Sequence, residues 1–103
     1  MVDLQYGFLS VRYEVTGFGH NDHGSFPVGV WHIEHCVQSE TMELAIAEGD
    51  MSEPPAAHIA TVLTAMAADG WRAEETTQVT QQFHDRRYEN LLIRVARASV
   101  ATA

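Results

Sequence analysis

The sequence has no lysine, only one cysteine and no long apolar run, and each shortage excludes a class of protein. Without lysine, the chain has no Schiff-base nucleophile and no lysine general base. The single cysteine, Cys36, cannot form a disulfide within the chain, which fits a reducing compartment. The apolar runs are far too short to cross a bilayer, so we expect no membrane association.

Positive charge is scarce as well, because six arginines stand against 14 acidic residues, for a formal net charge of −8. A nucleic-acid-binding surface needs clustered cations that release counterions from phosphate. The pair Arg86 and Arg87 is too short a basic run to form one, so we expect no nucleic-acid partner. The first ten residues carry Asp3 and no cation, unlike a secretory signal, and we therefore expect a cytoplasmic protein.

Hydrophobic and charged residues are present in ordinary globular proportions, 46% and 19% of the 103 residues. A chain of this length predicts one domain, spanning residues 1–103, with a real core. Its last residues, 98–103, read ASVATA and are expected to form a frayed tail.

The first half of the chain has the alternation of β-strands. Apolar and polar residues alternate over 5–16, which predicts a half-buried strand, and a second strand is predicted over 28–37. The intervening residues 17–25, GFGHNDHGS, are rich in turn formers and predict an exposed loop. On the second strand, one face is expected to carry Trp31, Ile33, His35 and Val37, and the other Val28, Val30, His32, Glu34 and Cys36.

The segment 41–48, TMELAIAE, is ambiguous between strand and helix. Its alternation favours a strand that forms a hairpin with the previous one through 38–40, whereas the spacing of Met42, Ala45 and Ile46 would also suit a short helix. We favour the strand. Two further strands are predicted near the end of the chain, over 71–80 and 88–97, joined by a turn at 81–86.

A helix is predicted between these two sets of strands. Ser52 is the expected cap, and Pro54 and Pro55 fit the first turn. The helix should end near Asp69, because Gly70 supplies the left-handed residue that terminates a helix, and Trp71 can then fold back onto Met66. Its apolar face should comprise Ile59, Val62, Leu63, Met66 and Ala67.

The predicted order is therefore β-β-β-α-β-β, an α+β fold in which one helix packs on one face of an antiparallel sheet of about five strands. One helix cannot cover such a sheet completely. We expect the remaining surface or a free edge strand to be covered by a second copy of the chain or by a protein partner.

The unit of helix, Gly70, Trp71 and following strand resembles a small uncharacterised bacterial family, the "domain of unknown function" family numbered 4177. Members open with a tyrosine-containing strand, similar to Tyr13-Glu14-Val15 here, and close on a strand with a basic residue, similar to Leu92-Ile93-Arg94. The resemblance covers about half the chain, and residues 17–50 depart from the family's shorter form. The resemblance implies a fold but does not imply any activity.

Four of the six histidines fall within sixteen residues of one another, beside the only cysteine. Imidazole and thiolate are preferred ligands of zinc, copper and nickel, so a transition-metal site could be built from His20, His23, His32 and Cys36. The spacing matches no established metal motif, and each residue also suits an ordinary structural position. His35 should not take part, because the strand points it to the opposite face.

Other candidate binding residues lie beside this group: Trp31 could line a pocket, with Glu34 and Arg12 on neighbouring strands. A thiol–imidazole pair at Cys36 would lack the helix N-terminus that usually activates such a thiol, so we favour a protein that is not an enzyme. The sequence thus favours a non-catalytic accessory or binding module that acts as a homo-oligomer or with a protein partner. A metal-binding protein and a small-molecule enzyme that uses the same histidine-rich face are the alternatives.

Overall fold

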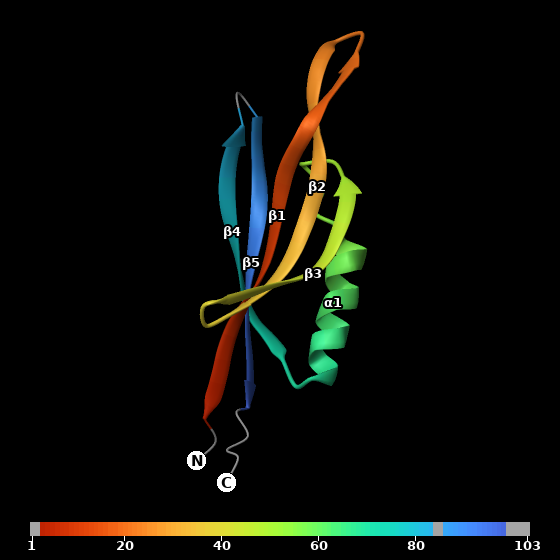
Figure 1. Cartoon of the computed structure of the whole chain (residues 1–103). Helices are drawn as coiled ribbons and strands as arrows, with labels where there is room; N and C mark the ends of the chain where they lie inside the picture. Colours follow the sequence, from red (N-terminus) through yellow and green to blue (C-terminus); the bar gives the residue numbers. More distant parts are fainter. Residues whose placement is uncertain (1–2, 84–85, 99–103) are drawn as a thin grey trace.

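The computed structural model describes residues 3–83 and 86–98, in which five strands form one antiparallel sheet and one helix follows the third strand (Figure 1). The predicted order β-β-β-α-β-β and the predicted α+β fold are confirmed. The elements are β1 (Leu4–Asn21), β2 (Gly24–Val37), β3 (Glu40–Gly49), α1 (Ala56–Ala68), β4 (Arg72–Phe83) and β5 (Arg86–Ala98). The segment 41–48 is therefore strand, as favoured. The predicted tail, apart from Ala98 in β5, lies outside the described residues.

The strands lie side by side in the order β3-β2-β1-β5-β4, so the long first strand is central. Alternation along β1 places Leu9, Val11 and Tyr13 on one face, opposite Ile33 and Trp31 of β2. This face carries the core, because all five side chains are at most 5% exposed. The alternation in the sequence therefore groups the residues of β2 by face correctly, and the structure shows that the face with Trp31 and Ile33 points inward.

Residues 17–25 do not form the predicted exposed loop. β1 and β2 continue as a paired ribbon up to Asn21 and Gly24, with a register shift between Val15 and Gly17. The side-chain oxygen of Asn21 accepts a hydrogen bond from the backbone N–H of His23 at 2.8 Å, which closes a tight turn. The turn-forming residues therefore form a turn only at the end of the hairpin, and the others lie in the two strands.

The helix begins differently from the prediction. Its N-cap is Pro55, which has no side-chain capping hydrogen bond, and both prolines precede the first helical residue. Ser52 does not cap the helix, because its backbone N–H and its hydroxyl both donate to the carboxylate of Asp50, at 2.8 and 2.6 Å. The acidic side chain two residues away thus competes successfully for the serine.

The helix ends as predicted. Gly70 adopts a positive φ of 89°, and the N–H groups of Gly70 and Trp71 donate to the carbonyls of Ala67 and Met66, each at 3.0 Å. These two bonds form a Schellman motif, which satisfies two carbonyls at the helix end. Trp71 and Met66 are both buried members of the core, so the tryptophan returns the chain to the sheet.

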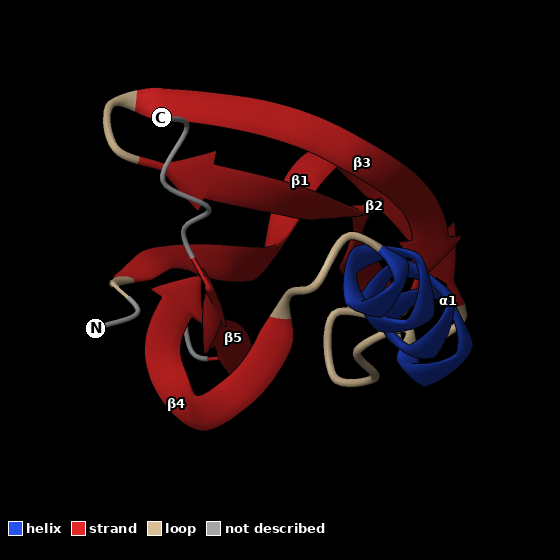
Figure 2. Ribbon diagram, turned by 90° about the horizontal axis from the view of Figure 1, so that it is seen from below, coloured by secondary structure: helices blue, strands red, loops and turns tan. Residues whose placement is uncertain are grey.

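Only two helical side chains, Val62 and Met66, are buried, while Ile59 and Leu63 are partly buried and Ala67 is exposed. The helix contacts β3 and β4, the two edge strands. Seen along the strands, the sheet curls and the helix lies beside the curved end of β3 (Figure 2). It therefore lies toward the β3 edge of the sheet, and Val62 and Met66 pack from there onto the core.

The opposite face of the sheet is polar at its middle and apolar near one end. Arg12 pairs with Glu34 at 2.5 Å, and Arg94 pairs with Glu74 at 3.0 Å. Exposed apolar side chains gather on the first residues of β1, namely Leu4, Tyr6 and Phe8. Their coverage by a second copy or another protein stays a prediction. Among the described residues, no helix is both long and apolar enough to cross a membrane.

Gly70→Ala should lower the free energy of unfolding by about 1 kcal/mol or more, because alanine resists a positive φ. A Cβ at this position would meet no atom within 4 Å, so the loss would come from the backbone alone. Urea denaturation followed by circular dichroism measures it. Gly70→Asn, which tolerates the left-handed region better, should lose less. Equal stability of Gly70→Ala and the wild type would contradict the helix stop.

Candidate functional site

The four predicted metal ligands lie at separate places in the structure. His20 and His23 lie at the tip of the β1–β2 hairpin, where the His20 ring is hydrogen-bonded to the Ser25 hydroxyl at 2.9 Å. β2 begins at Gly24, directly after His23, and His32 lies eight residues further along this extended strand, which corresponds to roughly 26 Å. Cys36 lies four residues, or about 13 Å, further on.

His32 lies on the face of the sheet opposite the core, where its ring contacts two carboxylates. Its two ring nitrogens lie against carboxylates of the neighbouring strands, Nδ1 at 3.2 Å from Glu43 and Nε2 at 3.4 Å from Glu14. The residue is 8% exposed. An imidazole with both ring nitrogens directed at carboxylates has no nitrogen oriented toward a separate metal ion.

Within the part of the chain that the structure describes, no group of three or more His, Cys, Asp or Glu side chains is arranged to hold a metal ion. The hypothesis of a zinc, copper or nickel site at His20, His23, His32 and Cys36 therefore has no geometric support in a single chain. The predicted cluster was close in sequence, but an extended strand spreads its residues in space.

The other predicted binding residues have structural roles. Trp31 is fully buried in the core, and its indole N–H donates to the Asp50 carbonyl at 3.0 Å. Arg12 and Glu34 pair with each other on the open face. None of the three lines the pocket described next.

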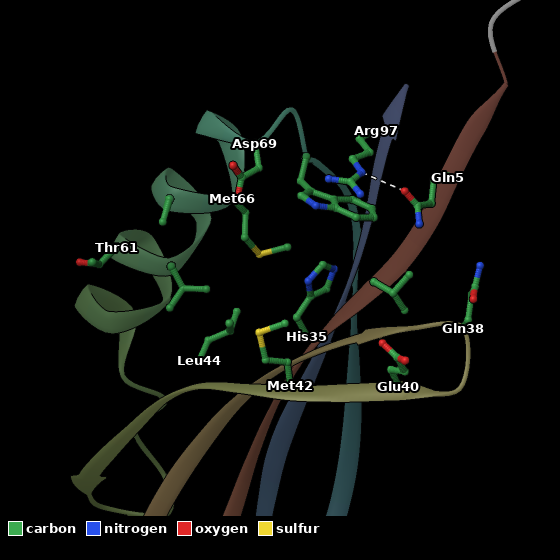
Figure 3. A pocket seen from close by; sticks show the side chains of 14 residues that line it. Gln5, His35, Gln38, Glu40, Met42, Leu44, Thr61, Met66, Asp69 and Arg97 are labelled. Carbon is green, nitrogen blue, oxygen red and sulfur yellow. Dashed lines mark hydrogen bonds between the residues drawn. The ribbon is translucent and has the colours of Figure 1, made fainter. Parts of the chain in front are cut away.

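A pocket of about 680 Å³ lies between the C-terminal half of α1 and the sheet, at the end of the sheet where β2 turns into β3 (Figure 3). Its walls are helical residues on one side and the β2–β3 hairpin on the other. The lining residues are Gln5, His35, Val37, Gln38, Glu40, Met42, Leu44, Thr61, Val62, Ala65, Met66, Asp69, Trp71 and Arg97.

A bulge in β3 and small side chains on α1 leave room for this pocket. The pairing of β2 with β3 shifts between Ile33 and Glu34, so that Leu44 is an extra residue in β3. Such a bulge bends its strand, and here it accompanies the curl of β3 toward the helix. On the helix, Thr61 and Ala65 line the pocket, and their small side chains do not fill the gap.

Trp71 lies at the centre of a polar cluster at one end of the pocket. The His35 ring meets it edge-on, with ring centroids 4.8 Å apart and an interplanar angle of 87°. The guanidinium carbon of Arg97 lies 4.6 Å from the Trp71 ring centroid, and the Arg97 Nε–H donates to the Gln5 side-chain oxygen at 2.9 Å. The cluster joins β1, β2 and β5 to Trp71, the residue that directly follows the helix stop at Gly70.

His35 is the least satisfied member of this cluster. Its Nε2 atom is buried and has no hydrogen-bond partner in the described part of the chain. The ring lies over Gly7, where a Cβ would approach Nε2 to 3.2 Å and the Cys36 carbonyl to 2.9 Å. Burial, and secondarily the positive charge of Arg97, lowers the pKa of the His35 imidazole below its ordinary value of 6.5. Both effects favour the neutral form of His35.

The sequence placed His35 on the correct face but assigned it no role. A signal was present, because His35 stands between Ile33 and Val37 on a face that otherwise points to the core. A polar residue at an inward position is more informative than an apolar one. The partnership of His35 with Trp71 and Arg97 joins residues far apart in the chain, and alternation alone does not indicate it.

Comparison of the chain with protein-family models, with curated proteins and with solved structures finds no match. The resemblance to the "domain of unknown function" family numbered 4177 therefore stays a prediction. The candidate site rests on the geometry of this chain alone.

The lowered pKa of His35 predicts a pH dependence of stability. Because the unfolded chain takes up a proton at His35 near pH 6.5 and the folded chain takes it up only at lower pH, stability should fall as the pH drops below about 6.5. His35→Gln should show a smaller loss in free energy of unfolding between about pH 7.5 and pH 5.5 than the wild type, measured by urea denaturation. His23→Gln, at the hairpin tip, is the control and should behave like the wild type. An unchanged pH dependence in His35→Gln would refute the assignment.

Proposed function

We propose that this chain is a non-catalytic binding module that holds a small, largely apolar organic molecule in the pocket between α1 and the sheet. The observation that carries the proposal is the pocket itself, with a volume of about 680 Å³. Pockets that bind small molecules usually measure about 300–1,000 Å³ and combine apolar walls with a few polar groups.

The walls suit an adaptable apolar ligand. Met42, Leu44 and Met66 line the pocket, and Met42 and Leu44 are 62% and 37% exposed. Covering them would remove apolar surface from water, which favours binding. Methionine is flexible and polarizable, so two methionines allow the walls to fit ligands of varied shape.

The lining residues favour binding over catalysis. They include one hydroxyl, that of Thr61, which donates to the Ala57 carbonyl at 3.0 Å and is therefore not held by a general base. His35 makes no hydrogen bond to a carboxylate in the described part of the chain. A catalytic imidazole is usually oriented by such a partner. This arrangement supports the binding module and not the alternative of a small-molecule enzyme.

Filling the pocket should abolish binding without unfolding the chain. The neutral fluorophore N-phenyl-1-naphthylamine should bind the wild type saturably, with one site and a blue-shifted emission. Ala65→Phe places a ring in the pocket and should weaken binding at least about tenfold, a change of roughly 1.4 kcal/mol. Ala60→Phe, the same change at an exposed helical position outside the pocket, should bind like the wild type.

Circular dichroism of both variants checks that they are folded. If the fluorophore does not bind the wild type, or if Ala65→Phe and Ala60→Phe bind it equally, the pocket is not a binding site and the proposal is wrong.

A further inference from the structure

Building on the proposed binding function, we infer that the pocket selects ligands that carry a carboxylate, with Arg97 as the residue that pairs with it. The apolar body of such a ligand would lie against Met42, Leu44 and Met66, and its carboxylate would lie at the Trp71 end. The inference names the chemical class of the ligand: an aliphatic or aromatic monocarboxylate.

The first argument is that Arg97 carries a charge without a counterion. It is the one cationic side chain that lines the pocket, and it is only partly exposed. Within residues 3–83 and 86–98, no carboxylate pairs with it, whereas Arg12 and Arg94 are both paired with glutamates. A partly buried cation without an anionic partner is costly, and a bound carboxylate would remove that cost.

The second argument is that Arg97 is held in place. Its Nε–H donates to Gln5 and its guanidinium lies over the ring of Trp71. These contacts use one edge and one face of the guanidinium. Its terminal NH₂ groups are the donors that suit a planar carboxylate, and a guanidinium fixed in advance loses little entropy when it binds one.

The third argument concerns the charges around the pocket. Glu40 is exposed at the start of β3, at the hairpin end of the pocket, where its charge disfavours a carboxylate (Figure 3). Asp69, the C-cap of α1, is exposed and lies at the same end as Trp71 and Arg97. The attraction for a carboxylate at that end therefore has to come from Arg97 itself, whose charge acts on the pocket interior and contributes to the lowered pKa of His35.

Octanoate and 1-octanol test the inference, because they share a chain length and differ in the head group. Each is titrated as a competitor of N-phenyl-1-naphthylamine, which is neutral and reports on the pocket alone. Octanoate should displace the fluorophore from the wild type at a concentration at least about tenfold lower than 1-octanol does. Arg97→Gln should lose this preference and still bind the fluorophore. Arg94→Gln, on the same strand but paired with Glu74 on the other face, should keep it.

Arg97→Met, which keeps apolar contact with Trp71, should also lose the preference and serves if Arg97→Gln does not fold. If both competitors displace the fluorophore equally from the wild type, the carboxylate inference is wrong and the proposed binding function stands. If Arg94→Gln loses the preference as fully as Arg97→Gln, net charge is the cause and the assignment to Arg97 is wrong. If the fluorophore does not bind at all, both proposals fail.

Discussion

The end of the helix at Gly70 is the constraint on which the rest of this structure depends. The positive φ of Gly70 and the two backbone bonds of the Schellman motif set the direction in which the chain leaves α1. That direction brings Trp71 against the sheet, where it contacts His35 and Arg97. One backbone conformation thus closes the core at the end of the helix and also builds the polar end of the pocket.

The pocket has a stability cost that a filled core would avoid. Within the described residues, the His35 Nε2 atom has no hydrogen-bond partner and Arg97 has no carboxylate partner, and both features disfavour folding. The space beside Thr61 and Ala65 also lacks packing contacts. Larger apolar residues at these positions could remove all three costs. A bound ligand would offset these costs, which agrees with the proposed binding function.

Most of the fold could be predicted from the sequence because it depends on local patterns. Alternation identified the faces of β1 and β2, and Gly70 followed by Trp71 identified the helix end. The site could not be predicted in the same way. His20, His32 and Cys36 lie close in sequence but far apart along extended strands, whereas Gln5, His35 and Arg97 meet only through the pairing of β1 with β2 and with β5. The bulge at Leu44 likewise depends on the register of the β2–β3 pair.

The most direct test of the binding site uses the methionine methyl groups as reporters. Met42 and Met66 line the pocket, whereas Met51 is buried in the core outside it. Protein labelled with ¹³C at the methionine methyl groups is titrated with octanoate and followed by NMR. The account predicts that the Met42 and Met66 signals shift saturably and together while the Met51 signal stays in place. Equal shifts at all three, or no shift at Met42 and Met66, would contradict a ligand bound between the helix and the sheet.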